Sequence, residues 1–469
     1  MTFSAGRLLT RIDRAAGGLA ADLFLYALSA AFALVTALTS TLLPHRAWGS
    51  IASWAYAAAT LLVLAQIVVR RSAYAATRLG TGPADPVTKL GTGAADAATR
   101  LGTGAAYAPT RLGTGAAYAP ARLSGTGARA ALTWLTWLAA CLVPLIVEAM
   151  QRAGGRTDRA QDEVLVVERM GERLLHGGTP YVGPDVISAL PADERLAAYS
   201  PYQPGMAVFG LPRAVFGDFW WTDARVWFAV VTAGALVGAV SIMRPAGVRV
   251  RAIQVVTVLP ICALTLATGG DDLPVLALCL LALALAATDR YGWAGVAVGA
   301  AAACKLFAFP VVAVLAALAL TAGRGRRLLP AAVGLPVLVL IPPFLVDADA
   351  FVENVIRFPF GHGIVQSPAQ SPFPGYLIAQ NLPGGRYVAA ALLVAVAAAI
   401  AVRLVRRPPR TTAEAALICG FGLLAAILLM PTTRFGYLLY PAAFLVWAPA
   451  LSIPTAASAP HGDSALYRR

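Results

Sequence analysis

An acidic stretch in the first half of the chain is the first place to look for chemistry. It spans residues 151–221, and within it the segment TDRAQDEVLVVERMGERLLHGGTPY carries two adjacent acids, Asp162 and Glu163. Asp162 is a good helix N-cap, and Gly177-Gly178 would stop the helix. The apolar residues between them recur at helical spacing: Val164, Val167, Met170 and Leu174. A carboxylate at the start of such a helix could accept a proton from a hydroxyl group.

Polar residues also interrupt the apolar sequence at several later turns. The segment TGGDDLP contains two adjacent acids, a lone lysine follows an alanine-rich run, and RFGYLLYP begins with an arginine. A second loop, residues 346–385, includes the proline-rich QSPAQSPFPGY and could be a lid over a site. The titratable residues of interest in these turns are Asp271, Asp272, Lys305, Arg357, His362 and Arg434. Whether they can act together depends on the elements that position them.

Those elements are predicted to be membrane helices. Apolar residues make up 58% of the chain and charged residues only 13%, which is far from the balance of a soluble domain. We therefore predict an all-α integral membrane protein, a polytopic bundle of about twelve transmembrane helices. The first apolar run lacks a convincing cleavage site, so we interpret it as a span and not as a signal peptide. The predicted spans are 20–43, 51–69, 131–150, 222–243, 252–268, 273–287, 294–303, 306–321, 329–345, 386–402, 413–430 and 437–451.

The basic residues predict the orientation of this bundle. The net charge is +14, and the short loops with arginine clusters fall on the same side as the N-terminus (Arg244, Arg249 and Arg251; Arg324, Arg326 and Arg327; Arg403, Arg406, Arg407 and Arg410). Such clusters are typical of cytoplasmic loops. We predict a multi-pass protein of the cell membrane with both termini cytoplasmic and the acidic loop outside. The positive charge then needs no nucleic-acid partner.

The chain divides into four predicted regions. Residues 1–75 form an N-terminal two-helix membrane module, and residues 76–130 form a cytoplasmic linker built on an 11-residue repeat such as TRLGTGAAYAP. Each repeat holds two glycines and few large apolar residues, which favours a flexible linker over a coiled coil. Residues 131–451 form the membrane core, with outer loops at 151–221 and 346–385. The helix that starts at Asp162 is amphipathic, so we predict that its apolar face lies on the bilayer surface. We interpret the later apolar stretch YSPYQPGMAVFGLPRAVFGDFWW, which is too short to cross the membrane, as re-entrant or interfacial. Residues 452–469 form a cytoplasmic tail.

The five cysteines are scattered through apolar segments (Cys141, Cys262, Cys279, Cys304 and Cys419). Their spacing suggests neither a disulfide framework nor a zinc site, so we interpret them as small buried apolar residues. Asp271 and Asp272 could bind a cation, but they could equally end a helix. We predict no metal site.

The motifs together resemble a known family. The chain looks like a GT-C-fold glycosyltransferase, closest to the family 87 mannosyltransferases that use polyprenyl-phosphate-mannose, over roughly residues 131–451. In that family an acid in the first large outer loop precedes a helix that ends in a G-x-x-P-Y pattern, which QDEVLVVERMGERLLHGGTPY resembles. YSPYQPG, TGGDDLP, AGVAVGAAAACKLFAFP and RFGYLLYP are similar, in the same order, to later family patterns. The two spans before residue 131 are not part of the family's common core.

The resemblance implies an activity and roles for these residues. It implies transfer of a sugar, most commonly mannose, from a polyprenyl-phosphate donor to a glycolipid or polysaccharide acceptor on the outer face, by an inverting single displacement. Asp162 would be the base, with Glu163 the next candidate, because the family's Asp-Leu-x-x-Tyr run lacks its tyrosine here. Cations would bind the phosphate, and the candidates are Lys305, Arg434, Arg357 and His362. Further site candidates are Asp158, Tyr181, Tyr202, Asp271 and Asp272. No cofactor is implied beyond the lipid-linked donor, which is a substrate.

Two other functional classes stay open. A transporter or lipid flippase would place ionisable residues in mid-span and broken helices in matched halves, whereas here the polar groups gather at the ends of the spans. A non-catalytic scaffold for envelope assembly would tolerate Asp162→Ala. The residues also have plain structural readings, since Asp162 could be only a helix cap and Lys305 could only snorkel to the headgroups.

Overall fold

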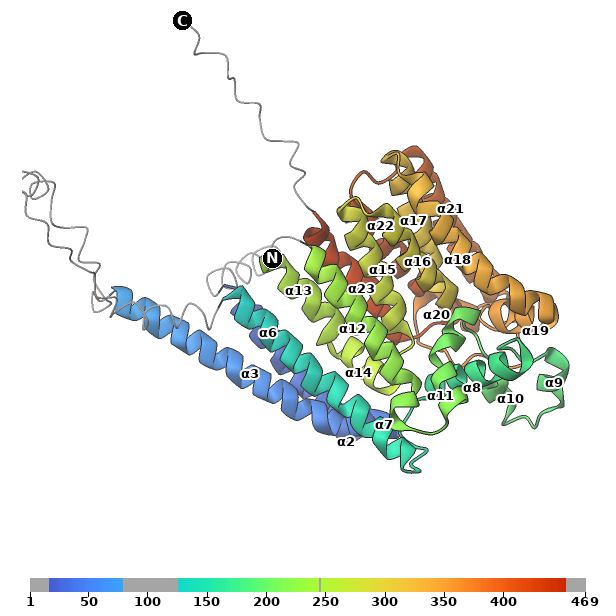
Figure 1. Ribbon diagram of the computed structural model, residues 1–469, viewed down its shortest axis with the longest axis horizontal. Coiled ribbons are helices and arrows are strands. Elements are labelled where there is room, and N and C mark those ends of the chain that lie inside the picture. The colour runs from blue at the N-terminus through green and yellow to red at the C-terminus, as the bar shows by residue number, and fades with distance from the viewer. Residues whose placement is uncertain (1–16, 79–124, 244–245, 453–469) are drawn as a thin grey trace, which may run out of the picture.

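The computed structural model describes residues 17–78, 125–243 and 246–452, and these residues form an elongated bundle of helices (Figure 1). Within these ranges no strand is formed, and the single β feature is an isolated parallel bridge between Gln370 and Thr433. The 11-residue repeats and the predicted tail lie outside the described residues, apart from the ends of each segment. The all-helical class is confirmed.

The helices of the bundle proper are α2 (Leu19–Thr39), α3 (Leu43–Arg78), α6 (Thr126–Trp137), α7 (Val143–Ala153), α12 (Ala224–Ile242), α13 (Ala246–Thr257), α14 (Pro260–Thr268), α15 (Asp272–Ala287), α16 (Tyr291–Cys304), α17 (Phe309–Thr321), α18 (Gly325–Val346), α21 (Gly385–Arg406), α22 (Thr412–Leu429) and α23 (Leu439–Trp447). The loops carry α8 (Asp162–Gly177), α9 (Pro184–Ala189), α10 (Arg195–Ala198), α11 (Leu211–Phe216), α19 (Ala348–Val352) and α20 (Pro374–Asn381). Short 3-10 or π turns complete the chain: η1 (Leu138–Leu142), η2 (Pro204–Phe209), η3 (Trp220–Thr222), η4 (Leu306–Ala308), η5 (Glu353–Arg357), η6 (Phe435–Leu438) and η7 (Ala448–Leu451).

Seven helices in the described ranges are long and apolar enough to cross a membrane. They are α2, α3, the continuous α6–η1–α7, α12, α18, α21 and α22, and the pair α13 and α14, bent by 44°, could form an eighth span. The remaining four predicted spans coincide with shorter apolar helices, Asp272–Ala287, Tyr291–Cys304, Leu306–Thr321 and Phe435–Leu451. A helix of about 16 residues is only about 24 Å long, less than the hydrocarbon core. A count of twelve therefore stays a prediction.

Two predicted breaks have different outcomes. The break around Lys305 is confirmed, since α16 ends at Cys304 and Lys305 is extended before η4 and α17. The first span was predicted to reach residue 43, but α2 ends at Thr39 and α3 starts at Leu43. The turn between them is closed by Ser40, whose hydroxyl accepts a hydrogen bond from the Leu42 amide (3.2 Å). The proline that follows lies in the first turn of α3, where a missing N–H costs no hydrogen bond.

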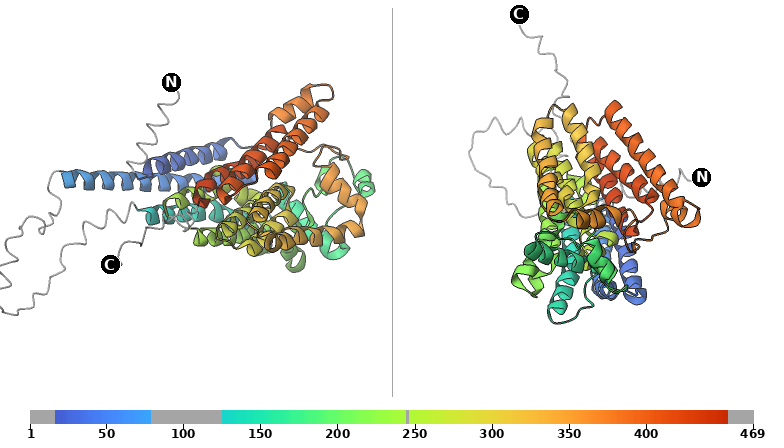
Figure 2. Two further views of the ribbon diagram at one scale, coloured as in Figure 1. Left: turned by 90° about the horizontal axis from the view of Figure 1, so that it is seen from above. Right: turned by 90° about the vertical axis from the view of Figure 1, so that its right-hand side faces the viewer.

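The centre of the bundle is α15, almost all of whose residues are buried. It packs against α12 and α16, and α16 in turn packs against α18. The GxxxG pair Gly295 and Gly299 allows this last contact, because a Cβ at either position would lie 2.3 Å from a carbonyl oxygen of α18. By contrast α21 lies at the periphery (Figure 2), and only 6% of its apolar window is buried. The cysteines are buried, as predicted.

The N-terminal pair α2 and α3 is packed onto the core. The two helices lie side by side and α3 contacts η1, α7 and α14 (Figure 1). The Trp48 indole donates to the carbonyl of Ala140 in the π turn η1 (2.8 Å), and the Tyr56 hydroxyl donates to the carbonyl of Val258 (2.8 Å). At the other end of the pair the buried Asp22 carboxylate accepts two hydrogen bonds from the Arg129 guanidinium of α6 (2.5 and 2.8 Å).

At the opposite end of the bundle, which we call the loop end, α7 and α14 finish and α12 and α15 begin. The two loop regions pack on one another there. The Tyr199 hydroxyl donates to Glu353 (2.6 Å), and the Ser200 amide donates to the side chain of Asn354 (2.8 Å). Burial, followed by the Glu353 carboxylate, raises the pKa of Tyr199 to about 12. The second loop is thus fixed to the first through η5.

A buried ionic network fastens the first loop to the bundle. Arg225 and Glu148 are fully buried, and Asp223 is 1% exposed. The Arg225 guanidinium contacts the carboxylates of Asp223 (2.8 Å) and Glu148 (3.2 Å). Arg152 of α7 bridges Asp223 (3.0 Å) to Glu168 of α8 (2.5 Å). Burial alone would raise the pKa of Asp223, but the two guanidinium groups hold it well below its ordinary value.

This network gives a first testable prediction. Arg225→Leu removes the guanidinium from between two buried carboxylates, so we expect the free energy of unfolding to fall by about 3–5 kcal/mol. The measurement is the SDS-induced unfolding of the purified protein in mixed micelles, followed by tryptophan fluorescence. Arg324→Ala is the matched control, since its ion pair with Asp289 is largely exposed (38% and 55%) and is worth at most about 1 kcal/mol. Equal losses in the two variants would contradict the account.

Candidate functional site

The helix that carries the two candidate acids begins one residue earlier than predicted. Gln161, not Asp162, is the N-cap residue of α8, and it makes no side-chain cap hydrogen bond. The cause is a tertiary contact, because the Gln161 amide donates to the carbonyl of Thr268 at the end of α14 (3.0 Å). Asp162 is exposed, whereas Glu163 is partly buried. The predicted helix end is confirmed, with Gly178 as a left-handed C-cap.

The apolar face of α8 packs on protein. The sequence predicted that this face would lie on the bilayer, but Val164, Val167 and Met170 are fully buried. They are covered by η2 and α11, part of the apolar stretch that was predicted to be re-entrant or interfacial. Two glycines permit the contact, because a Cβ on Gly171 would lie 2.3 Å from the backbone of Gly210. The apolar face is therefore not available to lipid.

Polar residues from five separate segments of the chain meet at the loop end, beside the start of α8. We call this group the polar cluster, and its members are Glu163, Tyr202, Asp271, Asp272, Lys305, Arg434, Tyr437 and Tyr440. Six of the eight were predicted as site residues from the sequence. The backbone that carries Tyr202 is held from outside the cluster by Tyr181, whose hydroxyl donates to the Tyr202 carbonyl (2.9 Å).

The inner half of the polar cluster is centred on Lys305. Its ammonium group contacts the carboxylates of Asp271 (2.7 Å) and Asp272 (2.5 Å), and the residue is only 7% exposed. It also lies 5.2 Å from the ring centre of Tyr202 and 5.7 Å from that of Tyr437, within the range of cation–π attraction. The hydroxyl of Tyr440 donates to the same Asp272 carboxylate (2.8 Å). Two carboxylates therefore already balance the lysine charge.

The outer half of the cluster is the ion pair between Glu163 and Arg434, two residues that are 271 positions apart in the sequence. The Glu163 side chain is 17% exposed and that of Arg434 is 41% exposed. Burial alone would lower the pKa of Arg434, but the Glu163 carboxylate raises it above its ordinary value. Burial, and then the charges of Asp271 and Glu163, raise the pKa of the nearby Tyr202 hydroxyl. The pair is the more accessible part of the cluster.

Four candidates from the sequence have their contacts elsewhere. Asp158 pairs with Arg156 and Arg159 on the first loop. Arg357 is 58% exposed and pairs with Glu353 one turn away (3.6 Å). His362 is exposed and contacts the carbonyl of Phe360 (3.2 Å), and Asp162 faces solvent. Within the described ranges no group of three or more His, Cys, Asp or Glu side chains could hold a metal ion.

Comparison with known proteins gives the chain its family. Residues 200–431 match the family model described as Glycosyltransferase family 87. This match places the chain in glycosyltransferase family 87. No curated protein and no solved structure matches the chain.

The match covers only part of the polar cluster of this family 87 membrane glycosyltransferase. Tyr202, Asp271, Asp272 and Lys305 lie inside residues 200–431, whereas Glu163 and the last three members lie outside. The matched range is shorter than the resemblance drawn from the motifs, which extended over residues 131–451. Helices α2 and α3 fall outside the match, as do residues 131–199, so the division between an N-terminal module and the family's common core stays a prediction.

Two members of the cluster in this family 87 enzyme were not singled out in the sequence. Tyr437 and Tyr440 are three residues apart at the start of the last helix, so their rings lie on one face. Phe307, just after the lysine, packs against both rings (centroids 4.8 and 5.2 Å apart). The segment RFGYLLYP held the signal, because the two tyrosines come three and six residues after the charged turn residue Arg434.

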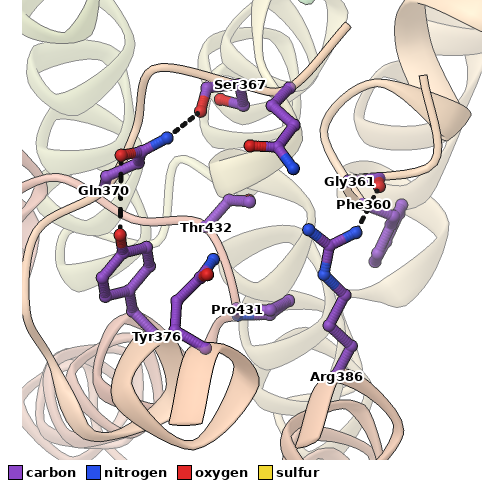
Figure 3. A pocket seen from close by; sticks show the side chains of 10 residues that line it. Phe360, Gly361, Ser367, Gln370, Tyr376, Arg386, Pro431 and Thr432 are labelled. Atoms are coloured by element: carbon purple, nitrogen blue, oxygen red, sulfur yellow. Dashed lines mark hydrogen bonds between the residues drawn. The ribbon is translucent and has the colours of Figure 1, made fainter. Parts of the chain in front are cut away.

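A second polar site of this family 87 enzyme lies beside the segment that carries Arg434. It is a small pocket of about 20 Å³, open to solvent, whose wall includes Pro431 and Thr432 (Figure 3). The opposite wall is formed by residues 360–370, and α20 and the start of α21 complete it. The parallel bridge joins the two walls, with the Ser371 amide donating to the Thr433 carbonyl (2.9 Å). The second loop thus lines a pocket, and the structure shows no opening or closing of it.

The lysine of the cluster gives the second testable prediction. Lys305→Met leaves two adjacent carboxylates buried without their cation, so we expect the protein to lose about 3–5 kcal/mol of stability. Replacing both aspartates by asparagine in the same chain removes the unpaired charges and should restore most of the loss. The measurement is again unfolding in SDS, with Arg324→Ala as the control. Failure of the double Asp→Asn change to recover any stability would contradict this pairing.

Proposed function

We propose that this membrane glycosyltransferase moves a mannosyl unit from a polyprenyl-phosphate donor to a hydroxyl group of a cell-envelope acceptor. The observation that supports this proposal is the Glu163–Arg434 ion pair at the accessible edge of the polar cluster. It sets a carboxylate that can accept a proton beside a guanidinium that can bind a phosphate. These are the two groups that such a transfer requires.

The proposed reaction is a single displacement. The acceptor oxygen bonds to the anomeric carbon as the bond from that carbon to the phosphate oxygen breaks, and the configuration inverts. The acceptor proton passes to the Glu163 carboxylate. Polyprenyl phosphate leaves with the bonding electron pair, and Arg434 balances its charge. No general acid is needed, because the phosphate is already a good leaving group.

The geometry favours Glu163 over Asp162 as the base. Both carboxylates are in the first turn of α8, but successive residues on a helix point about 100° apart. Glu163 faces Arg434, and the charge of Glu163 helps to raise the pKa of the Tyr202 hydroxyl in the polar cluster. Asp162 faces solvent. We therefore assign the base to Glu163, and we assign to Asp162 no contact with the substrates.

Arg434 is also the better of the cationic candidates for the donor phosphate. Lys305 is 7% exposed and holds two aspartates, so a phosphate would have to displace both of them. We propose that Lys305 is a positioning residue that fixes the break between α16 and α17. Arg434 is 41% exposed and pairs with one carboxylate. Donor phosphate would replace Glu163 as its partner, and this exchange would free the Glu163 carboxylate to act as the base.

The loop end is proposed to face the outside of the cell membrane. The support comes from arginine clusters on the loops at the other end of the bundle, such as Arg324, Arg326 and Arg327, because cytoplasmic loops are enriched in such residues. The donor and the acceptor would then meet outside. Transfer there requires no nucleotide sugar, since the lipid carries the sugar across the membrane.

The third testable prediction compares two isosteric changes at neighbouring positions. Glu163→Gln removes the proposed base, so we expect mannosyl transfer to fall by about 10²–10⁴-fold. Asp162→Asn is the matched control and should change the rate by less than about threefold. The measurement is the formation of a new glycolipid in membranes incubated with radiolabelled polyprenyl-phosphate-mannose.

Three other outcomes would count against the proposal. Loss of transfer in Asp162→Asn alone would move the base to Asp162. Equal transfer by both variants and the wild type would remove both acids as the base. Movement of labelled donor across sealed vesicles without any product would favour a lipid flippase.

A further inference from the structure

One side chain of the helix pair α2 and α3 reaches the start of α8, although the pair lies outside the range that matches the family. His45, in the first turn of α3, is partly buried, and its Nε2 atom is hydrogen-bonded to the side-chain amide nitrogen of Gln161. A primary amide nitrogen can only donate, so the imidazole nitrogen accepts. The contact joins the N-terminal helix pair to the residue that precedes the two candidate acids.

Gln161 is held from two further sides. Its backbone amide donates to the carbonyl of Thr268 (3.0 Å), and its side-chain oxygen lies against Gly269, where a Cβ would be only 2.4 Å away. The carbonyl of Gln161 accepts a hydrogen bond from the amide of Val164 (3.1 Å), which closes the first turn of α8. Gln161 thus connects α3, the end of α14 and the first turn of α8, and it lies two residues before Glu163.

The backbone that carries His45 is itself fixed. A Cβ on Gly49 would lie 2.6 Å from the carbonyl oxygen of Ala33, so the start of α3 packs closely on α2. The fully buried Trp48 donates to the carbonyl of Ala140 in η1, and α3 lies beside η1 and α7 (Figure 1). His45 therefore extends toward Gln161 from a helix that is anchored both to its partner helix and to the core.

We infer that His45 is a positioning residue for the transfer reaction. Through Gln161 it holds the first turn of α8, and with it the Glu163 carboxylate, in place beside Arg434. The inference rests on the proposed function, in which Glu163 is the base. A base must lie within hydrogen-bond reach of the proton that it accepts, so a small displacement of α8 lowers the rate. The helix pair α2 and α3 then serves the active site as well as anchoring the chain.

Kinetics of the full chain in lipid nanodiscs, with polyprenyl-phosphate-mannose as the donor, test this inference. His45→Ala leaves the Gln161 amide without its partner, so we expect kcat to fall about 10–100-fold. KM for the donor should stay the same or fall, because a displaced Glu163 competes less with the donor phosphate for Arg434. His45→Gln should recover most of kcat, since its side-chain oxygen can accept the same hydrogen bond.

Tyr56→Phe is the matched control for the kinetics. It also removes one hydrogen bond between α3 and the core, the one to the Val258 carbonyl (2.8 Å), but this bond lies away from α8. Both kcat and KM should therefore equal the wild-type values. Equal losses of kcat in His45→Ala and Tyr56→Phe would overturn the inference, because the His45 contact would then only fasten the helix pair to the core.

Hydrogen–deuterium exchange of the same variants gives a readout that does not depend on catalysis. In His45→Ala the amides at the start of α8, including that of Val164, should exchange about two- to tenfold faster, the factor expected for the loss of one neutral hydrogen bond. Tyr56→Phe and His45→Gln should exchange there like the wild type. Wild-type exchange and wild-type kcat in His45→Ala would overturn the inference. If Glu163→Gln retained normal transfer while His45→Ala still exchanged faster, the proposed function would fail and the contact between α3 and α8 would stand.

Discussion

Charges buried at one end of an apolar bundle must be paired, and this constraint organises the loop end of the protein. An unpaired charge in such surroundings costs several kcal/mol, so each charged turn is drawn onto the partner that neutralises it. Arg225 brings the ends of α7 and α12 together, and Arg152 ties α8 to them. Lys305 does the same for the turn before α15. The loop is therefore fixed by electrostatics as well as by apolar packing.

The same constraint separates structural charges from those available for chemistry. Lys305 and its two aspartates are buried and paired with one another, so they form a rigid support beside the Glu163–Arg434 pair. The Glu163–Arg434 pair is looser, because its arginine remains accessible. A pair of this kind can change partners when a phosphate binds. In this account the buried half of the polar cluster positions the exposed half, and the exposed half meets the substrates.

The sequence was most informative where a local pattern alone, such as hydropathy or a short motif, indicates the structure. Hydropathy located a helix at each predicted span, and the break at Lys305 followed from a polar residue between two apolar runs. The motifs predicted six members of the polar cluster and the family. The sequence favoured Asp162 over Glu163 as the base, whereas our proposal of Glu163 depends on its ion pair with Arg434, a residue 271 positions away in the sequence. Likewise, the sequence alone suggested that the apolar face of α8 lies on lipid. It could not show that η2 and α11 cover this face, because that contact forms only in the tertiary structure. The Arg225 network joins residues from three helices and leaves no local pattern.

The central claim is that the donor phosphate replaces Glu163 as the partner of Arg434. The most direct measurement is an electron cryo-microscopy structure of the full chain in nanodiscs with a non-cleavable phosphonate analogue of polyprenyl-phosphate-mannose. The account predicts the phosphonate within hydrogen-bond distance of the Arg434 guanidinium, with the Glu163 carboxylate released from it. A phosphonate bound elsewhere at the loop end, with the Glu163–Arg434 pair intact, would contradict the account.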